Sequence, residues 1–177
     1  IAQPAISPAY NEDGSPNSNT IYPNFLLQEE NSFYKTIIRR VNGRTFGDYE
    51  ILEGLKINGN FAYDLYYQTE DNFTGRNAPF QATNGEVFAS SVNAENYIVS
   101  GFLTYDKQLG DFHTLGLTAG TELNETTRRY ESVTANQFPS DDFTTVDGGA
   151  DIVAGSGNRS QNAFFSLFAR ATYDYAN

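Results

Sequence analysis

The sequence contains no cysteine, no methionine, no tryptophan and a single histidine among its 177 residues. Without cysteine the chain can form no disulfide, no cysteine-ligated zinc site and no thiol nucleophile. One imidazole is also too few for the usual transition-metal ligand sets. A Ser-His-Asp triad would have to use His113, which lies beside a tight turn at the start of a strand. We therefore interpret His113 as a structural or interfacial residue, and we expect the protein not to be an enzyme.

Basic residues are scarce as well. The chain has 11 Lys and Arg residues against 22 Asp and Glu residues, which gives a formal net charge of -11 and a pI near 4.3. Binding to nucleic acid requires a surface rich in Lys and Arg, and attachment to anionic lipid requires a polybasic segment. The acidic balance argues against both kinds of partner.

Long apolar runs are missing too. No segment approaches the ~20 residues of a membrane-spanning helix, and the first residues lack the basic and apolar segments of a signal peptide. We therefore expect a mature product or an internal segment of a longer protein. What the chain does have is 12 Tyr, 14 Phe and 15 Gly. This composition is typical of a transmembrane β-barrel, in which only alternate residues meet lipid, and also of a secreted β-sandwich.

Residues 55–67 carry an apolar, aromatic or glycine residue at every odd position and mostly polar residues at even positions. This period of two predicts a β-strand with one apolar face and one wet face. The segment is longer than the roughly 5–6 residues of an ordinary strand and reaches the about 9–11 residues of a tilted membrane strand. We expect nine residues on the odd side of this and later strands to face lipid: Leu55, Ile57, Phe61, Tyr63, Leu65, Leu115, Leu117, Phe165 and Leu167. Arg170, on the even side of the last strand, is expected to face the lumen, because an arginine facing lipid would cost about 2–4 kcal/mol at the membrane midplane.

The fold class that follows is all-β, an antiparallel meander with long loops. After a loop over residues 1–33, we predict five strands at about 34–49, 55–69, 96–105, 112–123 and 162–175. Their connections alternate between short turns, near 50–54 and 106–111, and long polar segments, 70–95 and 124–161. In the second turn, Gly110 is available for a positive φ. Outer-membrane barrels combine short periplasmic turns with longer extracellular loops, and we assign the connections accordingly. Five aromatic residues would then form part of the periplasmic girdle: Tyr49, Tyr105, Phe112, Tyr173 and Tyr175.

The two long polar segments contain the candidate contact residues. Their aromatic side chains could stack on sugar rings or contact a capping partner, or else pack the loops against each other: Phe73, Phe80, Phe88, Tyr130, Phe138 and Phe143. The carboxylates of Asp141, Asp142, Asp147 and Asp151 could bind Ca²⁺, although their spacing is not that of an EF-hand loop. A solvated acidic loop is the simpler interpretation, and we expect no other cofactor.

Several short motifs occur in order along nearly the whole chain. They are the loop Tyr10–Gly14, the turn Tyr49–Lys56, the hairpin Leu103–His113, the pair Ala119-Gly120, the loop Phe138–Asp141 and the strand Phe168–Tyr175. The turn reads YEILEGLK, the hairpin LTYDKQLGDFH and the strand FARATYDY. No single motif is specific, but their order and spacing resemble those of SusC/RagA-like TonB-dependent outer-membrane transporters.

The resemblance implies that the chain is an internal part of a bacterial outer-membrane barrel of about 22 strands. Such transporters import oligosaccharides or oligopeptides, draw energy from the inner membrane through contact of TonB with a plug domain, and are capped from outside by a SusD-like surface lipoprotein. No segment here resembles the plug, which we expect to lie outside these residues.

Three alternatives stay open at this level. A secreted β-sandwich that binds carbohydrate through its loop aromatics would bury the odd faces against a second sheet. A small self-contained barrel would need about eight strands, more than the five predicted. A hydrolase would need a pair of carboxylates across a cleft, which no spacing in the sequence indicates.

Overall fold

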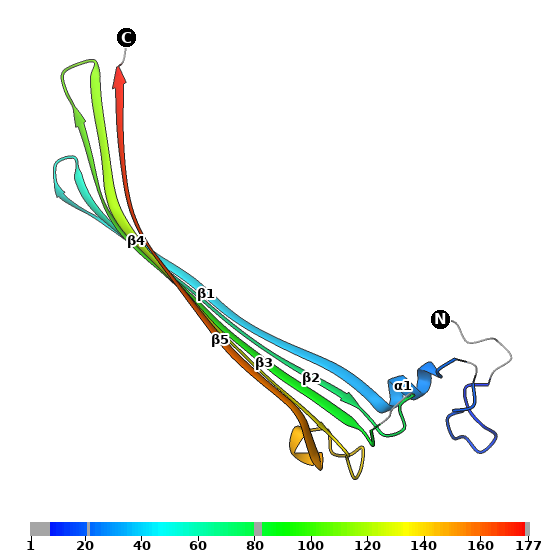
Figure 1. Cartoon of the computed structure of the whole chain (residues 1–177). Helices are drawn as coiled ribbons and strands as arrows, with labels where there is room; N and C mark the ends of the chain where they lie inside the picture. The colour runs from blue at the N-terminus through cyan, green and yellow to red at the C-terminus, as the bar shows by residue number, and fades with distance from the viewer. Residues whose placement is uncertain (1–7, 21, 80–82, 176–177) are drawn as a thin grey trace. The chain divides into compact units, whose positions relative to one another are not determined.

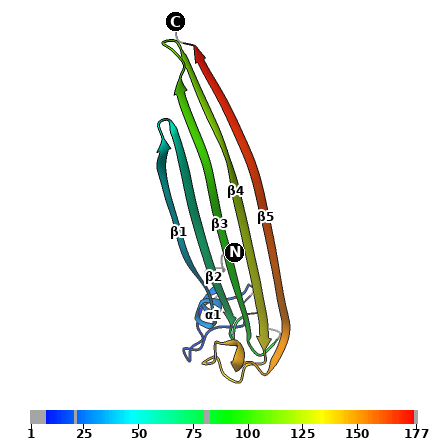
Figure 2. The same ribbon diagram turned by 90° about the vertical axis from the view of Figure 1, so that its left-hand side faces the viewer.

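The fold is a single open β-sheet. The computed structural model describes residues 8–20, 22–79 and 83–175. Its elements are α1 (Phe25–Asn31), β1 (Ser32–Leu52), β2 (Leu55–Thr74), β3 (Glu86–Gln108), β4 (His113–Asn136), the 3-10 turn η1 (Val146–Gly148) and β5 (Asp151–Tyr175) (Figure 1). Figure 2 shows the five strands side by side in chain order, β1-β2-β3-β4-β5. Because neighbouring strands follow one another in sequence through short connections, they are antiparallel. The predicted all-β meander is confirmed.

The strands are longer than predicted. They have 21, 20, 23, 24 and 25 residues from β1 to β5. The predicted loops 70–95 and 124–161 were therefore too long, and the connections that the structure shows are 75–85 and 137–150. The sequence missed these residues because many of them, such as 124–129, are polar and follow no period of two. Pairing with the neighbouring strand still holds them in the sheet. The predicted loop 1–33 was also partly wrong, because it contains α1.

All five strands belong to one sheet, and this bears on the sandwich alternative. A sandwich would need a second sheet to cover the apolar residues of the first. The described residues contain no second sheet and no closed barrel. Both edge strands, β1 and β5, have one neighbour each among the described residues.

The chain divides into two compact units, and every strand has residues in both. Unit 1 comprises Ile1–Ile38, Gln68–Val92 and Tyr130–Asn158, and unit 2 comprises Arg39–Tyr67, Asn93–Arg129 and Arg159–Asn177. All the buried hydrophobic residues among the described ones lie in unit 1: Leu27, Phe73, Ala78, Val87, Ala135 and Phe138.

The core of unit 1 is formed by the ends of three strands and one connection. Phe73 on β2 packs edge-on against Phe138 from the connection 137–150, with ring centroids 6.0 Å apart, and stacks on Phe33 at 5.6 Å. Val87 and Ala135 complete the buried cluster. In the same two connections, Asp141 accepts hydrogen bonds from the backbone amide and the Nε of Arg76, at 2.9 and 3.4 Å. These contacts fix the connection 137–150 to the connection 75–85.

The chain before β1 is ordered by polar contacts. Asn24 caps α1 by accepting a hydrogen bond from the Leu26 amide at 3.1 Å. The Tyr10 hydroxyl donates to Glu30 on α1 at 2.8 Å, and this bond raises the pKa of Tyr10. The Ser15 hydroxyl and amide donate to Asp13 and lower the pKa of that carboxyl group. No described helix is long and apolar enough to span a membrane.

Unit 2 has no buried residue among those described. It consists of the sheet and two tight turns, residues 53–54 between β1 and β2 and residues 109–112 between β3 and β4. Gly54 and Gly110 have φ angles of +79° and +78°. Gly110 was the glycine expected to supply a positive φ in the second turn. Gly54 is more constrained, because a Cβ there would overlap the carbonyl oxygen of Asp106 on β3.

The two turn glycines give a matched test of this geometry. We expect Gly110→Ala to lower the free energy of unfolding by about 1–2 kcal/mol, the usual cost of a left-handed conformation for alanine. Gly54→Ala should lower it further, since alanine adds a clash with Asp106 that nothing at Gly110 reproduces. Urea denaturation of the two variants measures the difference. Equal losses would show that the contact between Gly54 and Asp106 is absent from the folded protein.

Candidate functional site

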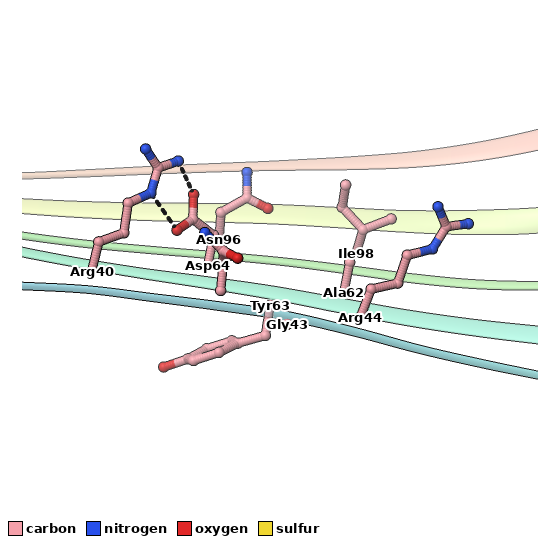
Figure 3. A pocket seen from close by; sticks show the side chains of 9 residues that line it. Arg40, Gly43, Arg44, Ala62, Tyr63, Asp64, Asn96 and Ile98 are labelled. Carbon is pink, nitrogen blue, oxygen red and sulfur yellow. Dashed lines mark hydrogen bonds and ion pairs between the residues drawn. The ribbon is translucent and has the colours of Figure 1, made fainter.

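Alternation in unit 2 produces two chemically different faces. On the even-numbered face, Arg40 of β1 binds Asp64 of β2, and Asn60 of β2 donates to Ser100 of β3. Figure 3 shows the side chains of Arg40, Asp64 and Asn96 on one side of the sheet and that of Tyr63 on the opposite side. Even-numbered polar residues from neighbouring strands therefore contact one another, as the period of two predicted.

The even face contains an open groove of about 400 Å³ over β1, β2 and β3. Its lining residues are Arg40, Asn42, Gly43, Arg44, Ala62, Tyr63, Asp64, Asn96 and Ile98 (Figure 3). Arg40 and Asp64 form a two-point ion pair, with Nε–Oδ1 at 2.9 Å and Nη2–Oδ2 at 2.6 Å. Their side chains are 57% and 34% exposed, so water screens the pair.

Amide and hydroxyl groups connect the strands beside this groove. The Nε of Arg44 donates to Asn60 at 2.5 Å, and Asn60 donates to Ser100 at 3.3 Å. Nearer the turns, Asn58 donates to the carbonyl oxygen of Phe102 at 3.4 Å and to the Thr104 hydroxyl at 3.3 Å. These hydrogen bonds join polar residues of the even face across β1, β2 and β3.

Aromatic residues also occupy the even face farther along the sheet, which the sequence did not indicate. Phe102 on β3 lies 6.1 Å from Phe168 on β5 between ring centroids. Gly120 on β4 makes this possible, since a Cβ there would overlap Phe102 and come within 2.7 Å of Phe168. In the sequence, the glycine of Ala119-Gly120 was the available signal that a large side chain lies close to β4. Arg170, expected to face the lumen, is exposed two residues along β5 from Phe168.

The odd face of unit 2 is apolar over most of its width. Of the residues expected there, five are exposed and four are half-buried: Ile57, Phe61, Leu117, Phe165 and Leu167 in the first group, and Leu55, Tyr63, Leu65 and Leu115 in the second. Leu167 is 77% exposed. A shallow groove of about 620 Å³ also lies on this face, between Leu55, Leu103, Leu117 and Ala169.

Polar side chains of neighbouring strands contact one another at two places on the odd face. Tyr97 on β3 donates to Glu125 on β4, and Gln161 on β5 donates to the other oxygen of Glu125 at 2.5 Å. Beside the turn 109–112, the Nδ1 of His113 and the Tyr173 hydroxyl share a hydrogen bond of 2.5 Å. The His113 ring also lies 5.1 Å from that of Tyr175. His113 therefore contacts two of the predicted girdle aromatics, and no described carboxylate forms an ion pair with it.

The candidate contact aromatics do not form one site. Phe73 and Phe138 are buried, at 4% and 2% exposure, so they pack the connection in place and are not available to a ligand. Phe73, Phe88 and Tyr130 lie on β2, β3 and β4, not in loops as predicted. Phe143 lies in the connection 137–150 and is 52% exposed. Phe80 lies outside the described residues.

Most of the acidic side chains considered as calcium ligands are engaged in separate local contacts. Asp141 binds Arg76, Asp142 accepts from the Ser140 hydroxyl at 2.8 Å, and Asp147 accepts from Thr145 at 2.5 Å. Nowhere in residues 8–20, 22–79 and 83–175 do three or more acidic or histidine side chains gather as metal ligands. The carboxylates instead make local contacts that shape the connection.

The chain is similar to solved structures of one transporter. Against the RagAB peptide importer in the "closed-closed" state and the RagAB peptide transporter, the TM-score is 0.80, with 15% identity. Against the "open-open" state it is 0.79, again with 15% identity. Each match covers 94% of this chain and 20% of the other, so the chain spans about a fifth of the length of those proteins. No family model and no curated protein matches the sequence. The likeness shows that this sheet has the fold of part of that importer.

The Arg40–Asp64 pair provides a test of how wet the even face is. We expect a double-mutant cycle of Arg40→Ala and Asp64→Ala to give a coupling free energy of at most about 1 kcal/mol, because both side chains are exposed. Urea unfolding of the four proteins measures it. A coupling of about 3 kcal/mol or more would mean that the pair is dehydrated in the intact protein, which contradicts a wet groove.

Proposed function

We propose that this chain is a segment of the barrel wall of a SusC-like importer in a bacterial outer membrane. Further strands would pair with β1 and β5 and continue the sheet into a barrel of about 22 strands. The odd face of unit 2 would meet lipid, and the even face would line the lumen through which a nutrient passes. The protein would work by binding and gating and would catalyse no reaction.

The observation that carries the proposal is the apolar odd face of unit 2, which no described part of the chain covers. Unit 2 contains no buried residue among those described, although large apolar side chains such as Phe165 and Leu167 stand on the sheet. A soluble domain would bury such a face, because each large side chain gains about 1.5–3 kcal/mol on leaving water. Lipid would cover it without a second protein layer.

The dimensions of the odd face also agree with a membrane. The alternating segment of 55–67, at ~3.3 Å per residue and a tilt of about 40°, spans roughly 30 Å along the membrane normal, as thick as a bilayer core. The long unpaired edges of β1 and β5 support a larger sheet, since an open edge within lipid would leave backbone groups without hydrogen bonds.

The fold likeness to the RagAB importer supports the same assignment, together with the family resemblance of the sequence. On this basis the imported solute would be an oligopeptide or an oligosaccharide. A SusD-like lipoprotein would approach the connections 75–85 and 137–150 from outside the cell. TonB would act on a plug that is not part of these residues.

Neighbouring residues on β5 give a direct test. Leu167→Arg would place a charge on the lipid face at a cost of about 2–4 kcal/mol, whereas Ser166→Arg would place it in the wet lumen at little cost. Both positions are exposed, so neither side chain has to displace a packed neighbour. We expect L167R to reduce the amount of folded protein in the outer membrane, measured by membrane fractionation, and S166R to leave it near the wild-type level.

A soluble module would behave differently. There both positions would meet water, and arginine at 167 would remove an exposed apolar surface and be neutral or beneficial. Wild-type levels of both variants, or recovery of the protein from the soluble fraction, would contradict the proposed function.

A further inference from the structure

The groove on the even face contains one arginine whose charge is not compensated. Two guanidinium groups, of Arg40 and Arg44, and one carboxylate, of Asp64, line it. Asp64 is bound at both oxygens by Arg40. Among the described residues no carboxylate lies within 4.0 Å of Arg44. The groove therefore has one excess positive charge in a chain whose net charge is -11.

Arg44 is held in a defined orientation. Its Nε donates to the Asn60 carbonyl oxygen at 2.5 Å, and the Asn60 amide donates in turn to Ser100. No described residue accepts a hydrogen bond from, or forms an ion pair with, the two terminal nitrogens of the guanidinium group. Figure 3 shows the Arg44 side chain on the same side of the sheet as Asp64 and Ile98, with no interaction to the other residues drawn. A fixed guanidinium with unused donors is suited to a planar anion.

The surroundings suit a small organic acid. Asn42 and Asn96 supply amide groups, and Ala62 and Ile98 supply a short apolar surface. Arg40 in the same groove already binds a carboxylate, that of Asp64, through its Nε and one terminal nitrogen. Arg44 has its Nε occupied, so it would bind the carboxylate through its terminal nitrogens.

From this arrangement we propose that Arg44 is a binding site for a carboxylate group of the solute that passes over the even face. The claim that this carboxylate belongs to an imported solute rests on the proposed function. The claim that Arg44 binds a carboxylate rests only on the residues of the groove. Arg44 would then favour acidic solutes over their neutral counterparts. Asn60 positions the guanidinium without touching the solute.

The test is protection of single arginines from chemical modification in the purified full-length protein. Phenylglyoxal labels arginines, and peptide mass spectrometry reads the labelling rate at each position. Succinate is the carboxylate probe and succinamide its neutral counterpart. Arg39 is the matched control, because it is exposed on the same strand and belongs to the opposite face.

We expect succinate, at about ten times its dissociation constant for the site, to slow the labelling of Arg44 by about tenfold. Succinamide should have no effect at Arg44, and neither compound should protect Arg39. In Asp64→Asn, which frees Arg40, succinate should protect Arg40 as well.

Two results would overturn the proposal. Equal labelling of Arg44 with succinate and with succinamide would show that it binds no carboxylate. An Arg44 that stays unlabelled without any added acid would show that a carboxylate of the protein itself already occupies it. Neither result depends on where the protein resides, so failure of the membrane assignment remains a separate finding.

Discussion

The fold depends on how an isolated apolar sheet face is kept out of water. In unit 2 the sheet has one apolar face, and no second layer covers it within the described residues, so something apolar outside those residues has to cover it. A lipid environment meets this condition, and it brings a second one, because no backbone donor or acceptor can be left unpaired in it. In such an environment the open edges of β1 and β5 would require neighbouring strands beyond the five described. Lipid would therefore account both for the cover over the apolar face and for the need to close the sheet.

The even face shows the complementary side of this arrangement. Polar groups collect on this face, where Arg40, Asp64 and Asn60 link β1, β2 and β3. Under the proposed function, a groove lined by such groups would hold and release a passing solute with modest affinity. Unit 1 differs, since the packing of Phe73 and Phe138 gives it a small protein core of its own. That core fixes the connection 137–150, which we propose to face the outside of the cell.

The sequence predicted the features that depend on the alternation of apolar and polar residues, and it missed those that do not. The alternation in residues 55–67 predicted β2 and its apolar side. The turn at Gly110 was predicted because glycine readily adopts a positive φ. The strand residues 124–136 were assigned to a loop, since Asn, Glu, Thr and Arg there follow no period of two. Helix α1 was missed because a helix of seven residues is too short to show a clear periodic pattern, although Asn24 before it was a visible capping signal. The Arg44 groove required cross-strand neighbours that spacing alone does not supply.

The most direct test of the account is thiol accessibility along residues 55–67 in the native membrane. The chain has no cysteine, so each introduced thiol is the only one in it. Single cysteines at positions 57, 58, 60, 61, 64 and 65 would be treated with a water-soluble maleimide in intact outer membranes. The account predicts that thiols at 58, 60 and 64 react and that those at 57, 61 and 65 are protected by lipid. Equal reaction at odd and even positions, or reaction at the odd positions alone, would contradict it.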